Sequence, residues 1–434
     1  MKKFFASIFL ILGILLAIEL GISYYVAGIV EQKFKDSIDL LNGNDVFSID
    51  LVYFRKGALR STAVTHIRYK PFENAKPIEV KHVFYNGPLI FTPSSDKLFQ
   101  FKMAIVNSTP GELPKSVSLP FTSQAIIDYR GGIELTAAGN AFSVTHNQYM
   151  IKGTGWSFRS LLDNQWQNLN SEVEFPGITV DLMGTNLNFQ KIKATFDQTI
   201  TSEGDWPGKI SIAIDNISDK AFLFELSNVQ FMVNETIKSE LLDFGWNLGF
   251  ESLKLANTPY GPLSLDLQLN HLAMVVLKKL SQKSSGEPIS DEMMSQLLQH
   301  SPEIIVNNAS LSLPGGQIDL SMNFKVGGSD IKLPISKEMI ENTLEGDFSL
   351  SIPKDMLKEW LSANIIKELG QDVNYQKLDP DHKKQYLEQQ LALKLQKFSQ
   401  DGIVTEKDKN YLIKMSISKG KWTVDGKEVT PPIS

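Results

Sequence analysis

The chain has 434 residues, a formal net charge of −6 at pH 7 and no cysteine. The acidic balance argues against nucleic-acid binding, which needs a concentrated basic face. The lack of cysteine excludes disulfides, thiolate chemistry and cysteine-based zinc sites. A chain of this length can bury a substantial core and normally forms more than one domain.

An apolar run follows Lys2 and Lys3 and covers residues 4–26. As a helix it would be about 34 Å long at ~1.5 Å per residue, enough to cross a hydrocarbon core of about 30 Å. The run is longer than the apolar part of a cleaved secretory signal, and it offers no small-residue cleavage site. We therefore expect residues 1–30 to form an uncleaved transmembrane signal-anchor. A cleaved signal and a buried helix are the alternatives.

Basic residues before the span predict its orientation. Lys2 and Lys3 should stay on the cytoplasmic side, which places the body on the far side of the membrane. Glu19 interrupts the span and is either a functional intramembrane group or a carboxyl that is protonated or reaches the interface. We favour the second interpretation, because a single helix has no bundle through which protons could be relayed.

The body, residues 31–434, has the pattern of an antiparallel β-protein. Residues 31–41 extend the first helix as an amphipathic stalk, and the turn residues at 42–45 break it. Arg130-Gly131-Gly132 predicts a hairpin turn, and Pro176-Gly177 and Gly184 predict strand ends. The predicted strands, which alternate with a period of two, cover residues 47–53, 62–68, 125–129, 133–136, 172–175, 179–182, 187–192, 209–214, 222–226, 230–233, 248–255, 263–269, 304–313, 317–326, 411–417 and 421–424.

Helical patterns appear in three zones. The first two cover residues 271–282 and 291–300, separated by the loop 281–288. In the third zone Pro353 opens a helix that Gly370 closes, and Asp379-Pro380 opens another that ends at Gly402. Leucine stripes on these helices predict packing against a sheet; a dimer interface or contact with a membrane surface is the alternative.

These patterns predict a mainly β (α+β) fold. An N-terminal transmembrane helix is followed by an extended, curved antiparallel β-sheet with several amphipathic helices packed on it. Within the body, residues 31–270 are mainly β, residues 271–402 interleave helices with strands, and residues 403–434 form a terminal β-hairpin. No Pro/Ser/Gly-rich linker divides the body.

Motifs for catalysis or cofactor binding are missing from the sequence. There is no HExxH, GxSxG, GxxxxGK[ST] or strand-linked GxGxxG pattern. The histidines do not have the spacing of a helical metal site. They are His66, His82, His146, His271, His300 and His382.

The remaining candidates have structural interpretations. Gly153-Thr154-Gly155 predicts a turn. Glu172 and Glu174 predict a solvated strand face, and Asp379 with Asp381 predicts a helix cap. Asp372 does not complete a calcium loop with them. The prediction is therefore no catalytic residue, no cofactor and no metal site.

Three segments resemble the YdgA-like bacterial family of unknown function. They are the turn at residues 53–62 (YFRKGALRST), the segment 83–89 (VFYNGPL) and the end 415–426 (MSISKGKWTVDG). Lys56 is an extra residue in the first motif, and Asn86 replaces a histidine in the second. The resemblance implies a protein anchored in the inner membrane of a Gram-negative bacterium with a periplasmic body. It supplies no catalytic residues.

The sequence leaves three hypotheses for the function. The first is non-enzymatic binding or conduction of a lipid or other amphiphile in a β-groove. The alternative is an envelope scaffold or protein-interaction module, including a homodimer. An enzyme ranks third, because no set of reactive residues supports it. The expected partners are the membrane, through residues 4–26, and a lipid ligand or an envelope protein, with no nucleic acid.

Overall fold

The computed structural model divides into two compact units, unit 1 (Met1–Ala221) and unit 2 (Phe222–Ser434). The division falls between strands, at a point where the sequence has no linker. Strands make up 57 % of the chain, which confirms a mainly β fold with a large antiparallel sheet. The residues that the structure describes are 2–42, 47–70, 77–91, 99–111, 117–118, 121–146, 149–182, 185–201, 205–219, 221–256, 258–281, 289–328, 331, 333–369, 373–424 and 426–429.

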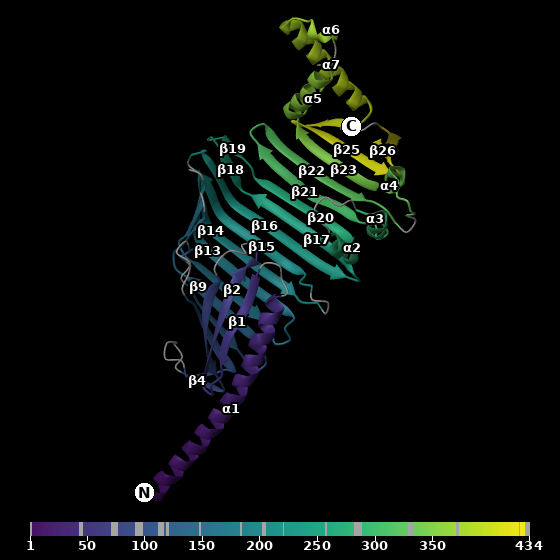
Figure 1. The fold of residues 1–434 in the computed structure, drawn as a ribbon. Coiled ribbons are helices and arrows are strands. Elements are labelled where there is room, and N and C mark those ends of the chain that lie inside the picture. The colour runs from purple at the N-terminus through teal and green to yellow at the C-terminus, as the bar shows by residue number, and fades with distance from the viewer. Residues whose placement is uncertain are drawn as a thin grey trace. The chain divides into compact units, whose positions relative to one another are not determined.

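Helix α1 (Lys2–Asn42) joins the apolar N-terminal run and the predicted stalk into one helix. Its stretch Leu15–Asp39 is long and apolar enough to cross a membrane, the property that a membrane anchor or a signal sequence would have. Figure 1 shows α1 leaving the strands of unit 1 toward the N-terminus. Among the residues that were predicted to break or close elements, Gly43, Gly184, Gly370 and Asp372 lie outside the described part of the chain, as does most of the loop 281–288.

The sheet of unit 1 is antiparallel throughout the pairings of its described strands. In spatial order it contains β1 (Phe47–Arg55), β2 (Arg60–Tyr69), β3 (Ile78–Asn86), β6 (Ala104–Pro110), β8 (Phe121–Ile127), β9 (Ile133–Gly139), β12 (Trp156–Leu162), β13 (Asn168–Leu182), β14 (Thr185–Thr199) and β15 (Gly208–Asp219). Three short strands, β7 (Val117–Ser118), β10 (Phe142–His146) and β11 (Tyr149–Gly153), continue from the second half of β13. A separate hairpin pairs β4 (Leu89–Phe91) with β5 (Phe99–Phe101).

The predicted strand break at Pro176-Gly177 is wrong, because β13 runs through it. Proline lacks the N–H that a paired strand uses. On one edge of β13 the pairing with β12 reaches Glu174 and the pairing with β11 reaches Ile178, so Pro176 lies between the two partners. On the other edge the register skips from Phe175 to Gly177. Neither ladder therefore needs a backbone N–H from residue 176, and a proline fits there.

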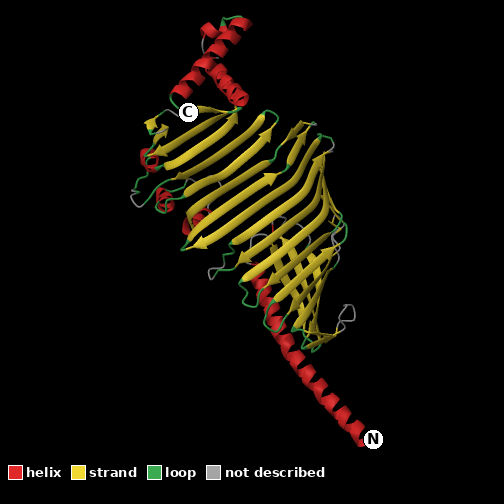
Figure 2. Cartoon of the chain, turned by 180° about the vertical axis from the view of Figure 1, so that it is seen from behind, coloured by secondary structure: helices red, strands yellow, loops and turns green. Residues whose placement is uncertain are grey.

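The core of unit 1 forms where α1 covers one face of the sheet. Val26 and Val30 of α1 are buried against Phe84 on β3 and Ala104 on β6. Side chains two apart on a strand share a face, so the alternation of β3 places Val80, His82 and Phe84 toward the helix. Figure 2 shows α1 as the long helix that runs from the N-terminus along strands of the sheet.

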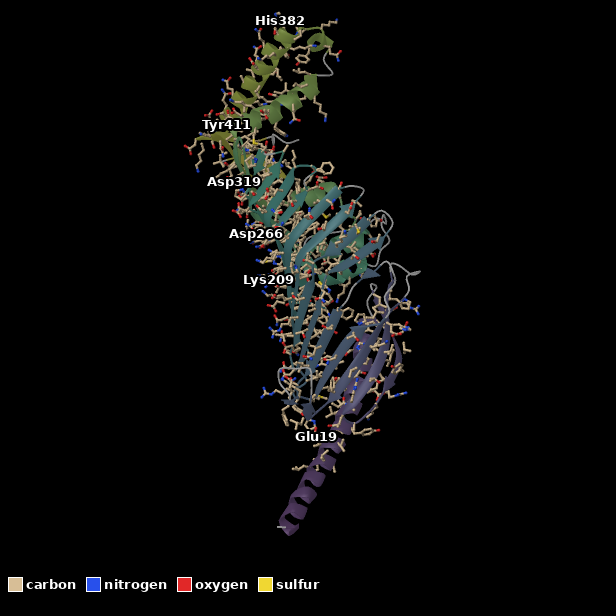
Figure 3. All side chains as sticks on the ribbon, turned by 90° about the vertical axis from the view of Figure 1, so that its left-hand side faces the viewer. Glu19, Lys209, Asp266, Asp319, His382 and Tyr411 are labelled. Atoms are coloured by element: carbon tan, nitrogen blue, oxygen red, sulfur yellow. The ribbon has the colours of Figure 1, made fainter. Side chains whose placement is uncertain are left out.

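The sheet of unit 2 has one polar and one apolar face. Its main strands are β16 (Phe224–Lys238), β17 (Leu241–Phe250), β20 (Leu263–Ala273), β21 (Glu303–Leu313), β22 (Gly316–Lys325), β23 (Glu345–Pro353) and β25 (Asn410–Ser418). Asp266 and Asp319 lie on the polar face, and Figure 3 shows both on the same side of the ribbon. Trp246, Leu267 and Val306 are register partners on the apolar face.

Shorter strands complete unit 2. β18 (Ser252–Leu255) pairs with β16 and with β19 (Thr258–Tyr260). β24 (Val404–Lys407) and β26 (Lys421–Val424) pair with successive halves of β25, and β27 (Lys427–Glu428) follows β26. The predicted C-terminal hairpin is confirmed by the pairing of Ser418 with Lys421. The two strands predicted at 222–226 and 230–233 merge into β16, with a positive φ of 51° at Asn228 between them.

The predicted helical zones correspond to α2 (Met274–Ser281), α3 (Asp291–Leu298), α5 (Lys354–Leu369) and α7 (Pro380–Gln400). Asp379 caps α7 as predicted, with Pro380 in its first turn. Pro353 is the last residue of β23, so the helix begins one residue later than predicted. The sequence analysis missed two short helices, α4 (Lys337–Thr343) and α6 (Val373–Gln376).

Cover on the apolar face of unit 2 is uneven. Leu357 and Leu361 of α5 pack in one buried cluster with Ile413 and Met415 of β25. Every residue of β17, by contrast, is only half-buried. Helices α5 and α7 project beyond the strand ends, as Figures 1 and 2 both show.

The docking of α1 gives a first prediction. Val30→Ala removes two methyl groups from a side chain that is 2 % exposed, which should lower the free energy of unfolding of unit 1 by about 2 kcal/mol. Val52→Ala on β1 makes the same change at a side chain that is 50 % exposed and should have an effect within about 0.5 kcal/mol. Denaturant unfolding of the detergent-solubilised chain measures both. Equal effects would contradict a stabilising role for the helix contact.

Candidate functional site

An apolar cavity of about 820 Å³ lies between α1 and the sheet of unit 1. Its size falls in the range of roughly 300–1,000 Å³ that is typical of sites for small ligands. Val30, Phe34 and Ile38 line it from α1, at the spacing that places them on one helix face. Valine, isoleucine, leucine, phenylalanine and methionine side chains from the strands form most of the opposite wall. They are Ile49, Ile67, Val80, Phe84, Met103, Val106, Phe121, Ile127, Ile133 and Leu135.

One imidazole lies in this apolar wall. His82 Nε2 is 2.8 Å from Thr65 Oγ1, and its Nδ1 is 2.7 Å from Ser108 Oγ. The ring of Phe34 meets the His82 ring edge-on, with 5.1 Å between centroids. Burial lowers the pKa of His82 from 6.5 to about 4. The imidazole is therefore neutral near pH 7, and the wall around it carries no charge from this residue.

The Ser108–His82 pair has the spacing of a nucleophile and a base, but the third group is unsuitable for hydrolysis. Hydrolytic triads orient the histidine with a carboxylate, whereas Thr65 offers His82 a hydroxyl. The strands that carry Ser108 and His82 are paired on both edges. Their backbone N–H groups therefore serve the ladder rather than an oxyanion. This arrangement satisfies polar atoms inside an apolar wall.

Three chain segments form a cationic and aromatic rim at the cavity. Lys33 of α1 places its Nζ 4.7 Å from the ring centroid of Trp166. The Trp166 indole Nε1 donates to the Gly131 carbonyl at 3.0 Å and so joins the β12–β13 turn to the β8–β9 turn. Arg130, next to Gly131, lines the cavity as well. We call Lys33, Arg130 and Trp166 the cavity rim.

Hydrogen bonds fix the geometry of the β12–β13 turn. Asp163 Oδ1 accepts from the Gln167 N–H at 2.8 Å, and its Oδ2 accepts from Asn168 Nδ2 at 2.7 Å. The bond to the Gln167 N–H is the main cause that lowers the pKa of Asp163. Trp166 has a positive φ of 59°, a conformation that this turn holds so that the indole can reach Gly131.

Two of the segments that carried the family resemblance meet beside α1. Asn86 is buried, and its Nδ2 donates to the carbonyls of Gly57 and Ala58 at 2.9 and 3.0 Å and to Ser61 Oγ at 3.1 Å. Ser23 Oγ of α1 donates to the Gly87 carbonyl at 2.5 Å. Asn86 thus joins the two turns to each other, and Ser23 joins the second turn to the helix, which is a structural role.

Glu19 belongs to the same region. Its Oε1 accepts from the Leu89 N–H at 3.0 Å and lies 3.3 Å from Ser23 Oγ. Figure 3 shows Glu19 where α1 meets the strand ends. Glu19 therefore ties the helix to β4 rather than pointing into an isolated membrane span.

Among the residues that the structure describes, none of the other sequence candidates belongs to a reactive group. Within the described residues no cluster of His, Asp and Glu could hold a metal ion. His382 bonds its own helix cap Asp379, and the backbone N–H of His382 is the main cause that lowers the pKa of Asp379. Figure 3 shows His382 at the tip of the helical arm, away from the sheet. Thr154-Gly155 forms the predicted turn between β11 and β12, and Glu172 pairs with Lys193 at 3.0 Å.

The sequence analysis missed the cavity rim and the Thr65–His82–Ser108 group. The only signal near them was the hairpin turn at Arg130-Gly131-Gly132, which β8 and β9 confirm. Lys33 and Trp166 carried no local signal, because their contact depends on the tertiary fold.

Comparison with known proteins gives one match. A family model described as a bacterial protein of unknown function (DUF945) matches residues 1–432. No curated protein and no solved structure matches the chain. The family covers both units and assigns neither of them an activity.

The buried imidazole gives a second prediction. The pKa of His82 is about 4 in the folded protein against an ordinary histidine value of 6.5, so the unfolded chain binds more protons between these values. Stability should therefore fall as the pH drops from 6.5 toward 4, by about 3 kcal/mol in total from this group. His82→Gln should remove that part of the pH dependence. His66→Gln, on the same sheet but more exposed, should retain it in pH-dependent denaturant unfolding.

Proposed function

The chain belongs to the bacterial family of unknown function DUF945, and we propose that it is a membrane-anchored, non-enzymatic protein that binds a lipid or other amphiphile. The observation that carries this proposal is the cavity under α1, with its apolar walls and cationic rim. An amphiphile needs both an apolar site for its chain and a polar site for its headgroup.

The cavity volume limits the size of the ligand. A methylene group is about as large as a water molecule, which takes ~30 Å³ in the liquid. A cavity of about 820 Å³ therefore holds on the order of 25 such groups. That suits one long acyl chain and its headgroup better than both chains of a phospholipid. The proposed occupant is a single-chain amphiphile, or one chain of a larger lipid.

The rim favours an anionic headgroup. Lys33 and Arg130 are exposed cations at the cavity, and Trp166 offers an amphipathic ring between them. Among the described residues, no carboxylate is recorded within salt-bridge distance of either cation. Charge-assisted hydrogen bonds from lysine and arginine suit a carboxylate or a phosphate. The neutral His82 deeper in the cavity suits an uncharged chain.

The location is part of the proposal. We infer that α1 anchors the chain in the inner membrane with its N-terminus in the cytoplasm and the body in the periplasm. Lys2 and Lys3 before the apolar run support this orientation. Exposed apolar side chains from Leu15 to Tyr25 on the described part of α1 support contact with lipid.

A second candidate function is an envelope scaffold, including a homodimer. The observation that favours it is the helical arm of α5 and α7, where Trp360, Ile366 and Leu393 are each at least 41 % exposed. Apolar side chains that are exposed in a group commonly mark protein contacts. A chain whose cavity takes up no amphiphile would favour this function over the first.

Filling the cavity gives the third prediction. Leu135→Trp adds bulk to a cavity-lining side chain of β9 and should abolish labelling of unit 1 by a C16 fatty acid that carries a photoreactive diazirine. Leu161→Trp is the matched control, because Leu161 pairs with Glu134 and therefore lies on the opposite face of the sheet. Mass spectrometry of the crosslinked full-length chain measures both. Saturable labelling that survives Leu135→Trp would contradict binding in this cavity.

Removing the rim charges gives the fourth prediction. Lys33→Gln with Arg130→Gln should weaken palmitate binding by about tenfold or more, as expected for losing hydrogen bonds to a charged group. Binding of hexadecanol, which has the same chain and no charge, should change little. Lys35→Gln with Arg159→Gln is the matched control away from the cavity lining. Competition against the photoreactive probe gives both affinities, and equal losses for acid and alcohol would argue against headgroup recognition at the rim.

A further inference from the structure

A second lipid contact is built into unit 1 at the end of its sheet where α1 emerges. Register pairs run across this end from Arg60–Tyr85 to Asn86–Ala104 and on to Ile127–Ile133. The β1–β2, β3–β4, β5–β6 and β8–β9 connections therefore share one end of the sheet. Ser23 and Glu19 of α1 bond to Gly87 and Leu89 at this same end.

Large apolar side chains are exposed at these connections. Leu59 is 49 % exposed, Leu89 48 %, Phe101 71 % and Tyr129 46 %. Leu89 and Phe101 are register partners of the β4–β5 hairpin, and the rings of Phe101 and Tyr129 lie 5.1 Å apart. Exposed apolar residues scattered singly need no explanation, but a group at one end of a domain marks a contact surface.

The bonds to α1 set the level of this surface along the helix. Glu19 and Ser23 both fall inside the apolar run of residues 4–26. At ~1.5 Å per residue, Glu19 lies about 10 Å before the end of that run. If α1 crosses the membrane with this run, the turn that Glu19 and Ser23 hold lies within about 10 Å of the membrane boundary.

Basic and aromatic residues accompany the apolar ones. Lys56 places its Nζ 4.3 Å from the ring centroid of Tyr24 on α1, and Arg60 lies 6.0 Å from the ring of Tyr85. Tyrosine is typical of the membrane interface, and lysine and arginine there attract anionic headgroups. Exposed apolar side chains at the connections, with Lys56 and Arg60 beside them and next to α1, are the arrangement that suits a membrane interface. A surface that faces water would not need it.

We propose that Leu59, Leu89, Phe101 and Tyr129 form a membrane-contact surface that enters the headgroup–acyl boundary of the leaflet from which α1 emerges. The occupant is the lipid bilayer itself. The proposal depends on α1 as a membrane span and does not depend on a ligand in the cavity. Because Arg130 of the cavity rim follows Tyr129 directly, this surface would bring the cavity rim close to the lipids.

The chain has no cysteine, so single introduced cysteines can report lipid contact at chosen positions. Phe101→Cys tests the surface. Leu15→Cys, exposed on α1, tests the span. Ala141→Cys, exposed in the β9–β10 turn at the opposite end of the sheet, is the control. Each full-length variant would be spin-labelled in vesicles of phosphatidylethanolamine and phosphatidylglycerol, and its collisions with oxygen and with a water-soluble nickel chelate compared.

The proposal expects the labels at positions 15 and 101 to collide preferentially with oxygen, which concentrates in lipid, and the label at 141 with the nickel chelate. A water-type profile at 101 with a lipid-type profile at 15 would overturn the membrane-contact surface and leave the anchor intact. A water-type profile at both would overturn the surface together with the span. A label at 101 that collides with the nickel chelate in vesicles but is shielded from it in intact cells would overturn the membrane-contact surface in favour of a protein partner.

Discussion

The packing of α1 against β3 and β6 is the contact on which unit 1 depends. Val26 and Val30 are buried against Phe84 and Ala104. Part of the apolar helix therefore belongs to the core of unit 1. Removing that helix would expose one face of the sheet to water, at a cost that scales with the apolar area uncovered. The same helix forms one wall of the cavity, which Val30, Phe34 and Ile38 line.

Most side-chain donors and acceptors in this region have local partners, whereas Asn86 Oδ1 is buried without a hydrogen-bond partner among the described residues. His82 uses both ring nitrogens on hydroxyls, and Asn86 uses its amide to hold the β1–β2 turn. An unpaired buried polar group costs more than its hydrogen bond gains, which explains why a lone histidine in an apolar wall has hydroxyl partners on both sides. The result is a cavity with apolar walls, an uncharged imidazole, and Lys33 and Arg130 at its rim.

Unit 2 has the same alternating strand pattern, but different elements cover its sheet. Its long strands alternate polar and apolar residues, so one face of the sheet is suited to water and the other requires cover. Helix α5 provides that cover over β25, where Ile413, Met415 and Ile417 are buried, while the residues of β17 stay half-buried. The apolar pattern of a strand fixes which side chains share a face, but neighbouring elements decide how deeply they are buried.

The sequence by itself determined the elements that depend on local physics. Continuous apolar character gave α1, Gly-rich turns gave the β8–β9 hairpin, and Asp379 with Pro380 gave the start of α7. Only the tertiary structure decided that β13 passes through Pro176, because partner strands happen to end on either side of it. It also decided that Lys33, Arg130 and Trp166 meet. Local periodicity assigns a residue to a face, but long-range strand order selects its neighbours, and a cavity consists of such neighbours.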